Sequence, residues 1–330
     1  MATAPKCIVV TGAHESIAYA TVFRIASGQL LGPNQRVIIH MLDDNYYQDV
    51  LLGVTNELRD CAFPLLDDVV YTSELPVAYK DVDYAFHIYS DTVGVKMNDD
   101  DIIKYNGTLF EKTGKAMNDY AKRDCKSIVI GDPANTNALV LAHSCPGIPR
   151  ENFTAMTRLD HNRALAQLAL KTGSIDISCL AIWGNHSATM YPDIRNTTVA
   201  GKKATNLVDA QWVNDEFIPR VQNRSDEINK LRGGLYSEQS SAASTSNAAI
   251  AHMRDWVLGS NEWQSVAVYS DGKAYGVPEG LIFSMPVTSA NGKFSLVKGL
   301  DFDDAESVAK IKKTTEELLD QRKLIEDLLK

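Results

Sequence analysis

The sequence predicts an α/β protein in which a doubly wound, mostly parallel sheet is followed by an α+β second domain packed on it. In the first half, short β-branched runs alternate with segments of helix length, which is typical of βαβ units and a parallel sheet. After Pro149 this rhythm changes. At 330 residues the chain is also long for a single hydrophobic core. We therefore expect one domain over residues 1–155 and a second over 156–330.

The elements of the first half follow from periodicity. Apolar, β-branched runs mark the strands, and apolar residues that recur at spacings of three and four mark the helices. The expected strands are 7–11, 37–42, 69–72, 84–89 and 127–131, and the expected helices are 17–27, 49–61 and 99–121.

The second half contains longer helical patterns. The expected helices are 160–170, 209–231, 240–258 and 303–329, and the expected strands are 180–183, 265–270 and 281–287. Gly233 and Gly234 break the chain between two of these helices. In the last helix, Glu316 and Glu317 are expected on a solvated outer face.

Composition excludes several classes of function. The charge sum of 33 basic and 42 acidic residues is −9, which disfavours nucleic acid and anionic membrane surfaces as partners. No apolar run approaches the roughly 18 residues of a membrane span, and no secretory signal precedes the first strand. The five cysteines are scattered without metal-ligand spacing, so we expect no metal site and a cytoplasmic location.

A turn between the first strand and the first helix has the position of a phosphate-binding turn. It runs TGAHESI over residues 11–17, and Asp43 ends the second strand. Glycines in such turns let the backbone approach a pyrophosphate, and the acidic residue holds ribose hydroxyls. Only the first glycine, Gly12, is present. The turn alone is equally consistent with a strand–helix connection that binds nothing.

Several longer strings occur in order and at near-constant spacing. They are DCAFPLL at 60–66, PANTN at 133–137, TRLDHNR at 157–163, WGNHS at 183–187 and DGKAYGVP at 271–278. From about Lys6 to the C-terminus the chain resembles the cytosolic type of malate dehydrogenase, as a divergent member of the lactate/malate dehydrogenase superfamily. The resemblance implies a Rossmann-type domain, a catalytic domain and NAD as cofactor.

The resemblance also implies roles for individual residues. His186 corresponds to the general acid/base, Asp160 to the carboxylate that orients it, and Arg163 to the group that binds the substrate carboxylate. The implied cofactor contacts are Gly12, Ile17, Asp43 and Asn135. Without the flanking strings, a lone histidine beside an apolar strand is better interpreted as a core residue.

Five positions depart from the family pattern. Glu15 replaces a glycine of the phosphate turn and brings bulk and negative charge to an anion site. Tyr89 replaces a glycine after the fourth strand, and Asp132 replaces an asparagine of the active site. Val93 and Asp99 replace the two arginines of the substrate loop, and residues 84–120 contain no arginine. Glu15 and Tyr89 argue against NAD binding, and the loop changes argue against a dicarboxylate substrate.

These departures favour a malate dehydrogenase-like protein whose NAD-dependent oxidoreductase site is impaired or lost, retained for a structural or interaction role. The alternative is an active NAD-dependent malate or other 2-hydroxy acid dehydrogenase with altered specificity. A third hypothesis is a module that binds a nucleotide through Asp43 without hydride transfer. We expect a homodimer, formed partly by helices 17–27, 49–61 and 160–170, or membership of a larger assembly such as the cytoskeleton.

Overall fold

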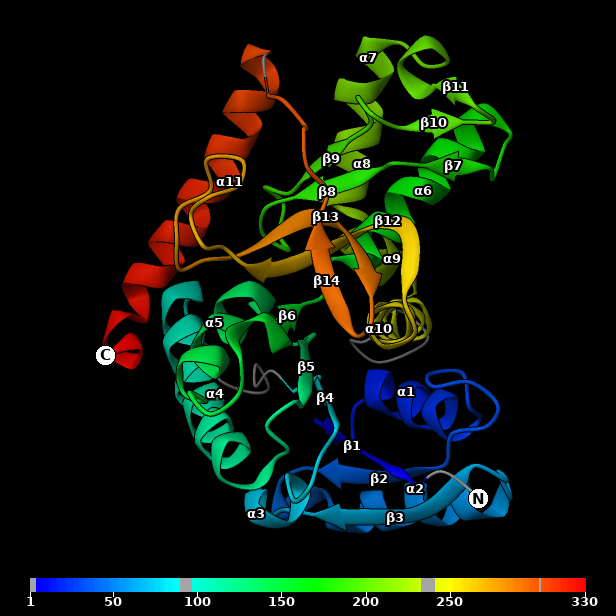
Figure 1. Cartoon of the computed structure of the whole chain (residues 1–330), viewed down its shortest axis with the longest axis vertical. Helices are drawn as coiled ribbons and strands as arrows, with labels where there is room; N and C mark the ends of the chain where they lie inside the picture. The colour runs from blue at the N-terminus through cyan, green and yellow to red at the C-terminus, as the bar shows by residue number, and fades with distance from the viewer. Residues whose placement is uncertain (1–3, 90–96, 233–240, 303) are drawn as a thin grey trace.

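In the computed structural model, residues 4–89, 97–232, 241–302 and 304–330 are described. The first half forms a parallel sheet in the order β3-β2-β1-β4-β5-β6 (Figure 1). The strands are β1 (Lys6–Thr11), β2 (Val37–Leu42), β3 (Leu66–Thr72), β4 (Tyr84–His87), β5 (Lys126–Val129) and β6 (Phe153–Ala155). The strand order reverses between β1 and β4, and the carboxyl ends of these two strands flank a crevice where ligands of such sheets bind.

Helices cover both faces of this sheet. Along β1, Val9 belongs to a core cluster that includes residues of α4 and α5, whereas Ile8 and Val10 belong to a cluster with α1 and α10. A strand buried on both faces reads as a continuous apolar run, which explains why this run was recognisable in the sequence. The helices of this half are α1 (Ser16–Ala26), α2 (Gln48–Asp60), α3 (Leu75–Ala78), α4 (Asp99–Tyr120) and α5 (Ala134–His143), with the 3₁₀ turns η1 (Asn45–Tyr47) and η2 (Arg150–Asn152).

Three antiparallel strands of the second half extend the same sheet to nine strands. They are β12 (Ser260–Tyr269), β13 (Ile282–Ala290) and β14 (Lys293–Leu296). The junction is a single pairing of Ala267 on β12 with Ala155 on β6. The expected count of five parallel strands was therefore short by β6, and α5 was also missed. Both lie in buried apolar segments in which periodicity carries little signal.

The rest of the second half packs around a third core cluster. Its strands are β7 (Ile177–Ser178), β8 (Ala181–Trp183), β9 (Tyr191–Asp193), β10 (Thr198–Val199) and β11 (Lys202–Lys203). Its helical elements are α6 (Arg158–Thr172), η3 (Ala204–Asn206), α7 (Ala210–Trp212), a π-helical segment (Val213–Phe217), α8 (Ile218–Gln222), α9 (Arg224–Arg232), α10 (Ala242–Leu258), α11 (Ala305–Leu324) and η5 (Glu326–Leu329).

The single helix expected over 209–231 was wrong. The chain forms α7, a π-helical segment, α8 and α9 in succession. Pro219 lies in the first turn of α8, where it has no backbone N–H to donate and its ring displaces the preceding turn. Asn223 then leaves helical geometry at the end of α8, and its side chain donates to the Pro219 carbonyl at 2.8 Å.

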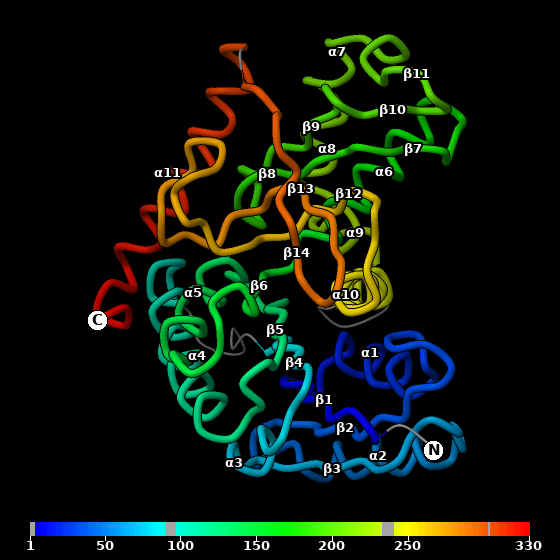
Figure 2. Tube along the Cα trace, in the orientation of Figure 1, coloured from blue at the N-terminus to red at the C-terminus, as the bar shows by residue number. Residues whose placement is uncertain are grey.

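The last helix, α11, connects the two halves. Figure 2 shows it passing from the second half to the side of α4 and α5, and it contacts both of these helices. Its N-cap, Asp304, accepts the backbone N–H of Ser307. No helix within the described residues has the length and apolar character needed to cross a membrane.

Candidate active site

The centre of the candidate site is a contact between His186 and Asp160. His186 lies in the turn between β8 and β9, and its Nδ1 is 2.5 Å from Oδ2 of Asp160 in the first turn of α6. The Asp160 side chain is fully buried and that of His186 is 16% exposed. Burial alone lowers the pKa of His186, but the charge and hydrogen bond of Asp160, with a further contribution from Asp132, raise it to about 9. The imidazole is therefore held as a proton donor at neutral pH.

Arg163 lies on the same face of α6, one turn after Asp160. Its Nη1 is 3.6 Å from Asp160 Oδ1, within ion-pair distance but too long for a hydrogen bond. Its buried Nε and Nη2 atoms have no hydrogen-bond partner among the described residues. Buried guanidinium N–H groups left open in this way are suited to a bidentate carboxylate ligand.

Asp132 follows β5 and faces the same charged groups. Its side chain keeps solvent access, but desolvation of the carboxyl raises its pKa, the charge of His186 opposes this, and the charge of Asp160 adds to it. A carboxylate at this position therefore adds negative charge beside the acid/base pair, where an asparagine would add none.

Asn135, in the first turn of α5, fixes the backbone of the His186 turn. Its Nδ2 donates to the carbonyls of Ile282 at 2.8 Å and Gly184 at 3.3 Å, and its Oδ1 accepts the His186 backbone N–H at 3.1 Å. All three amide positions that can reach the turn are thus occupied by the chain itself. The structure brings Asn135 to the acid/base pair rather than to the phosphate turn.

Glu317 holds the other side of the His186 turn and was placed wrongly on a solvated outer face. Its Oε2 accepts hydrogen bonds from Asn185, Ser187 and Thr189 at 2.5–2.9 Å. One helical turn earlier, Thr314 Oγ1 accepts the Asn185 backbone N–H at 2.9 Å. The hydrophobic period of α11 places Glu317 near solvent, and only the contact with a loop 130 residues away reveals its role.

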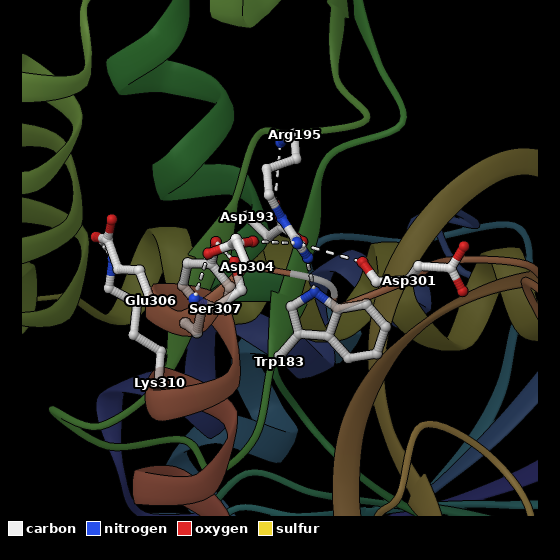
Figure 3. Close-up of polar contacts among 9 residues, drawn as sticks. Trp183, Asp193, Arg195, Asp301, Asp304, Glu306, Ser307 and Lys310 are labelled. Carbon is white, nitrogen blue, oxygen red and sulfur yellow. Dashed lines mark hydrogen bonds and ion pairs between the residues drawn. The ribbon is translucent and has the colours of Figure 1, made fainter.

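A charged network anchors the strands that flank the turn (Figure 3). Asp193 at the end of β9 accepts from Trp183 Nε1 on β8 at 3.1 Å and from the Arg195 guanidinium at 2.8 and 3.0 Å. Arg195 also reaches Asp304, the N-cap of α11, at 2.9 Å, and the Asp301 carbonyl. The β8–β9 hairpin that carries His186 is therefore tied to the start of α11 as well as to its middle.

The expected phosphate turn lies at the carboxyl end of β1 and has little free space. Gly12 has φ of +62°, and a Cβ there would lie 2.9 Å from the backbone of Tyr89. The glycine therefore serves the packing of two backbone segments. Glu15 is the N-cap residue of α1 and makes no side-chain cap, and Ile17 packs against the core beneath the helix.

The carboxylate of Asp43 is engaged within the protein. Its Oδ2 lies 2.6 Å from His14 Nδ1 and accepts the His14 backbone N–H at 2.8 Å, and its Oδ1 accepts the Asp44 backbone N–H at 2.8 Å. The side chain of Asp43 is fully buried, and the His14 ring above it stacks on Tyr47 with centroids 3.6 Å apart. In this arrangement the residues of the turn do not fit the ribose of NAD.

Beside this turn a hollow of about 220 Å³ remains at the carboxyl ends of β1, β2 and β4. Gly12, Asp43, His87 and Tyr89 contribute to its lining, together with residues of α4. His87 is buried, and burial lowers its pKa to about 3. The walls are thus mostly neutral, which suits a flat, uncharged group better than a phosphate.

The substrate-loop positions divide between described and undescribed residues. Val93 lies outside the described residues. Asp99 begins α4, is exposed, and is followed by Asp100 and Asp101 in the first turn. Acidic residues there stabilise the helix dipole, which supplies a structural reason for this run. Within the described residues, no group of three His, Cys, Asp or Glu side chains is arranged to hold a metal ion.

The fold and the site define a two-part α/β protein whose acid/base histidine lies beside the carboxyl edge of a dinucleotide-binding type of sheet. The comparisons place it further. The family model of the lactate/malate dehydrogenase NAD binding domain matches residues 6–154, and that of the lactate/malate dehydrogenase alpha/beta C-terminal domain matches residues 157–328. The chain belongs to the lactate/malate dehydrogenase family.

Solved structures agree over the whole chain. Malate dehydrogenase from Naegleria fowleri is 44% identical, with all of both chains covered and a TM-score of 0.94. Lactate dehydrogenase from Trichomonas vaginalis, in complex with NADH and oxamate, is 32% identical over 98% of this chain and 99% of that one, with a TM-score of 0.91. A malate dehydrogenase from Plasmodium falciparum, 20% identical with a TM-score of 0.80, shares the fold.

Proposed function

We propose that this chain is a malate dehydrogenase-like protein in which NAD binding, and with it oxidoreductase activity, is impaired or lost. The observation that carries the proposal is the engagement of Asp43 by His14. A ribose hydroxyl needs a free carboxylate oxygen, and both oxygens of Asp43 already accept hydrogen bonds from the chain. The negative Glu15 at the N-cap of α1 adds repulsion toward a pyrophosphate.

A thermal melt of the purified protein with and without millimolar NADH tests this proposal. A ligand that binds only the folded state raises Tm, so we expect no shift with NADH. The same sample then receives oxaloacetate and a panel of 2-oxo acids, and NADH oxidation is followed. A shift accompanied by turnover would contradict the proposal. A shift without turnover would support nucleotide binding without hydride transfer.

A second candidate is an active NAD-dependent dehydrogenase with altered specificity. Arg163 favours it, because its unpaired Nε and Nη2 atoms are suited to a substrate carboxylate and lie beside a proton-donating His186. Without an arginine over residues 84–120, we expect a 2-oxo acid with an uncharged side chain to be preferred over oxaloacetate. Equal or faster turnover of oxaloacetate would contradict this specificity.

If the oxidoreductase site is silent, the remaining role is structural or interactive. We propose a homodimer that uses exposed apolar residues of α1, α2 and α6, such as Tyr19, Leu52 and Leu170. We further propose that it acts in the cytoplasm, alone or within a cytoskeletal or other large assembly. Light scattering after gel filtration checks the dimer: wild-type mass should be twice that of the chain, and Leu52→Glu should shift it toward the monomer. A wild-type monomer would contradict the proposal.

A further inference from the structure

A second hollow, away from the His186 turn, has a strongly basic lining. It encloses about 170 Å³ between the end of α5, the loop before β6, the end of β12 and the last turns of α11. Three basic side chains line it: His143, Arg150 and Arg322. The remaining lining is apolar or neutral, from Leu139, Ala142, Tyr269, Gly280 and Leu329.

The two arginines lack carboxylate partners. Within the described parts of the chain, no Asp or Glu oxygen lies within ion-pair distance of Arg150 or Arg322. In contrast, Arg158 and Arg195 each pair with an aspartate at 2.7–2.9 Å. In a protein of net charge −9, two converging guanidinium groups without an acid are an uncompensated positive site.

Both guanidinium groups are nevertheless held in place by neutral acceptors. Arg150 Nη1 donates to the Tyr269 hydroxyl at 2.8 Å, and the guanidinium lies over that ring at 5.1 Å from its centroid. Arg322 Nη1 donates to the Glu279 carbonyl at 3.1 Å. The Arg322 guanidinium also lies against Gly280, where a Cβ would approach Nη1 to 3.0 Å.

Orientation without neutralisation leaves N–H groups of two forks, and the imidazole of His143, available to one ligand. Planar guanidinium groups recognise tetrahedral oxyanions by paired hydrogen bonds, which a lysine does not reproduce. The apolar side formed by Leu139, Ala142 and Leu329 could cover a small organic substituent. We propose that this hollow is a binding site for a phosphoryl group, either free phosphate or a phosphate monoester.

Isothermal titration calorimetry of the full chain, in chloride buffer at constant ionic strength, tests the site with inorganic phosphate and with phenyl phosphate. We expect saturable binding of at least one. Arg322→Gln and Arg150→Gln should each weaken it about tenfold, since each removes charge-assisted hydrogen bonds. Equal affinities for the two probes would assign the site to the free anion, and tighter phenyl phosphate binding would assign it to a monoester.

Lys313→Gln is the matched control, because it removes one positive charge from an exposed position of the same helix. It should leave the affinity within about twofold, since exposed charges act weakly at this ionic strength. Circular dichroism confirms that each variant is folded, and two variants on separate elements guard against the failure of one. No saturable binding by the wild type would overturn the proposal. So would unchanged affinity in both arginine variants, or a loss in Lys313→Gln as large as in Arg322→Gln.

Discussion

His14 Nδ1 lies 2.6 Å from Asp43 Oδ2, so the second residue after Gly12 occupies the carboxylate at the end of β2. The contact joins two segments 29 residues apart, and the stacked Tyr47 ring restricts the imidazole. The departure of the turn from the family pattern is therefore larger than the replacement of a glycine. The chain has supplied its own partner for the group that would hold a ribose.

Removing this partner should uncover nucleotide binding. We expect the double variant His14→Ala, Glu15→Gly to show an NADH-dependent rise in Tm that the wild type lacks, because Asp43 is freed and the turn loses a negative charge. At a concentration 100-fold above Kd the stabilisation would be about 2.7 kcal/mol. Tyr46→Ala is the control, since Tyr46 is 87% exposed in the adjacent 3₁₀ turn. A double variant that still shows no shift would indicate that Tyr89 or the undescribed loop blocks the site.

The His186–Asp160 contact makes stability depend on pH. The folded-state pKa of about 9 exceeds the unfolded value of 6.5, so the contribution is fully present below pH 6.5 and is lost as pH rises through 9. Asp160→Asn should lower the His186 pKa, because burial then acts without a compensating charge. Histidine ring NMR titration measures this. A wild-type pKa near 6.5 would contradict the arrangement.

Glu317 should matter more than its neighbour Glu316. Glu317→Ala removes three hydrogen bonds to the His186 turn, and we expect a loss of roughly 2 kcal/mol of unfolding free energy, given that each charge-assisted bond contributes about 1.5–3 kcal/mol before solvent compensation. Glu316→Ala loses only an exposed pair at 3.7 Å with Lys312 and should change stability by under about 0.5 kcal/mol. Urea unfolding of both variants provides the comparison, and equal effects would argue against a special role.

The Arg195 network should hold the β8–β9 hairpin. Arg195→Met leaves the Asp193 carboxylate, which is 3% exposed, without its charged partner. We expect destabilisation of about 3 kcal/mol, because breaking a buried pair strands a charge. Trp183 donates to the same carboxylate, so its fluorescence should change together with stability. Lys323→Met, which breaks an exposed pair with Asp320, is the control and should be nearly neutral.

The sequence predicted the elements that repeat a clear pattern. The strand over 37–42 was located to the residue, and the helices over 17–27 and 49–61 within one residue at each end, because their apolar faces recur at helical spacing. It did not predict the interruption at Pro219 of a helix whose apolar period continues, nor β6, whose three residues are too few to show a period.

By itself the sequence determined the family, the two-part α/β fold and the identities of His186, Asp160 and Arg163, since motif order and spacing are properties of the chain. Only the tertiary structure decided who contacts whom. His14 reaches Asp43 across 29 residues, and Glu317 reaches Ser187 across 130. Hydrogen bonds of this kind depend on which surfaces the packed core brings to within 3 Å, and no local period along the chain encodes that distance.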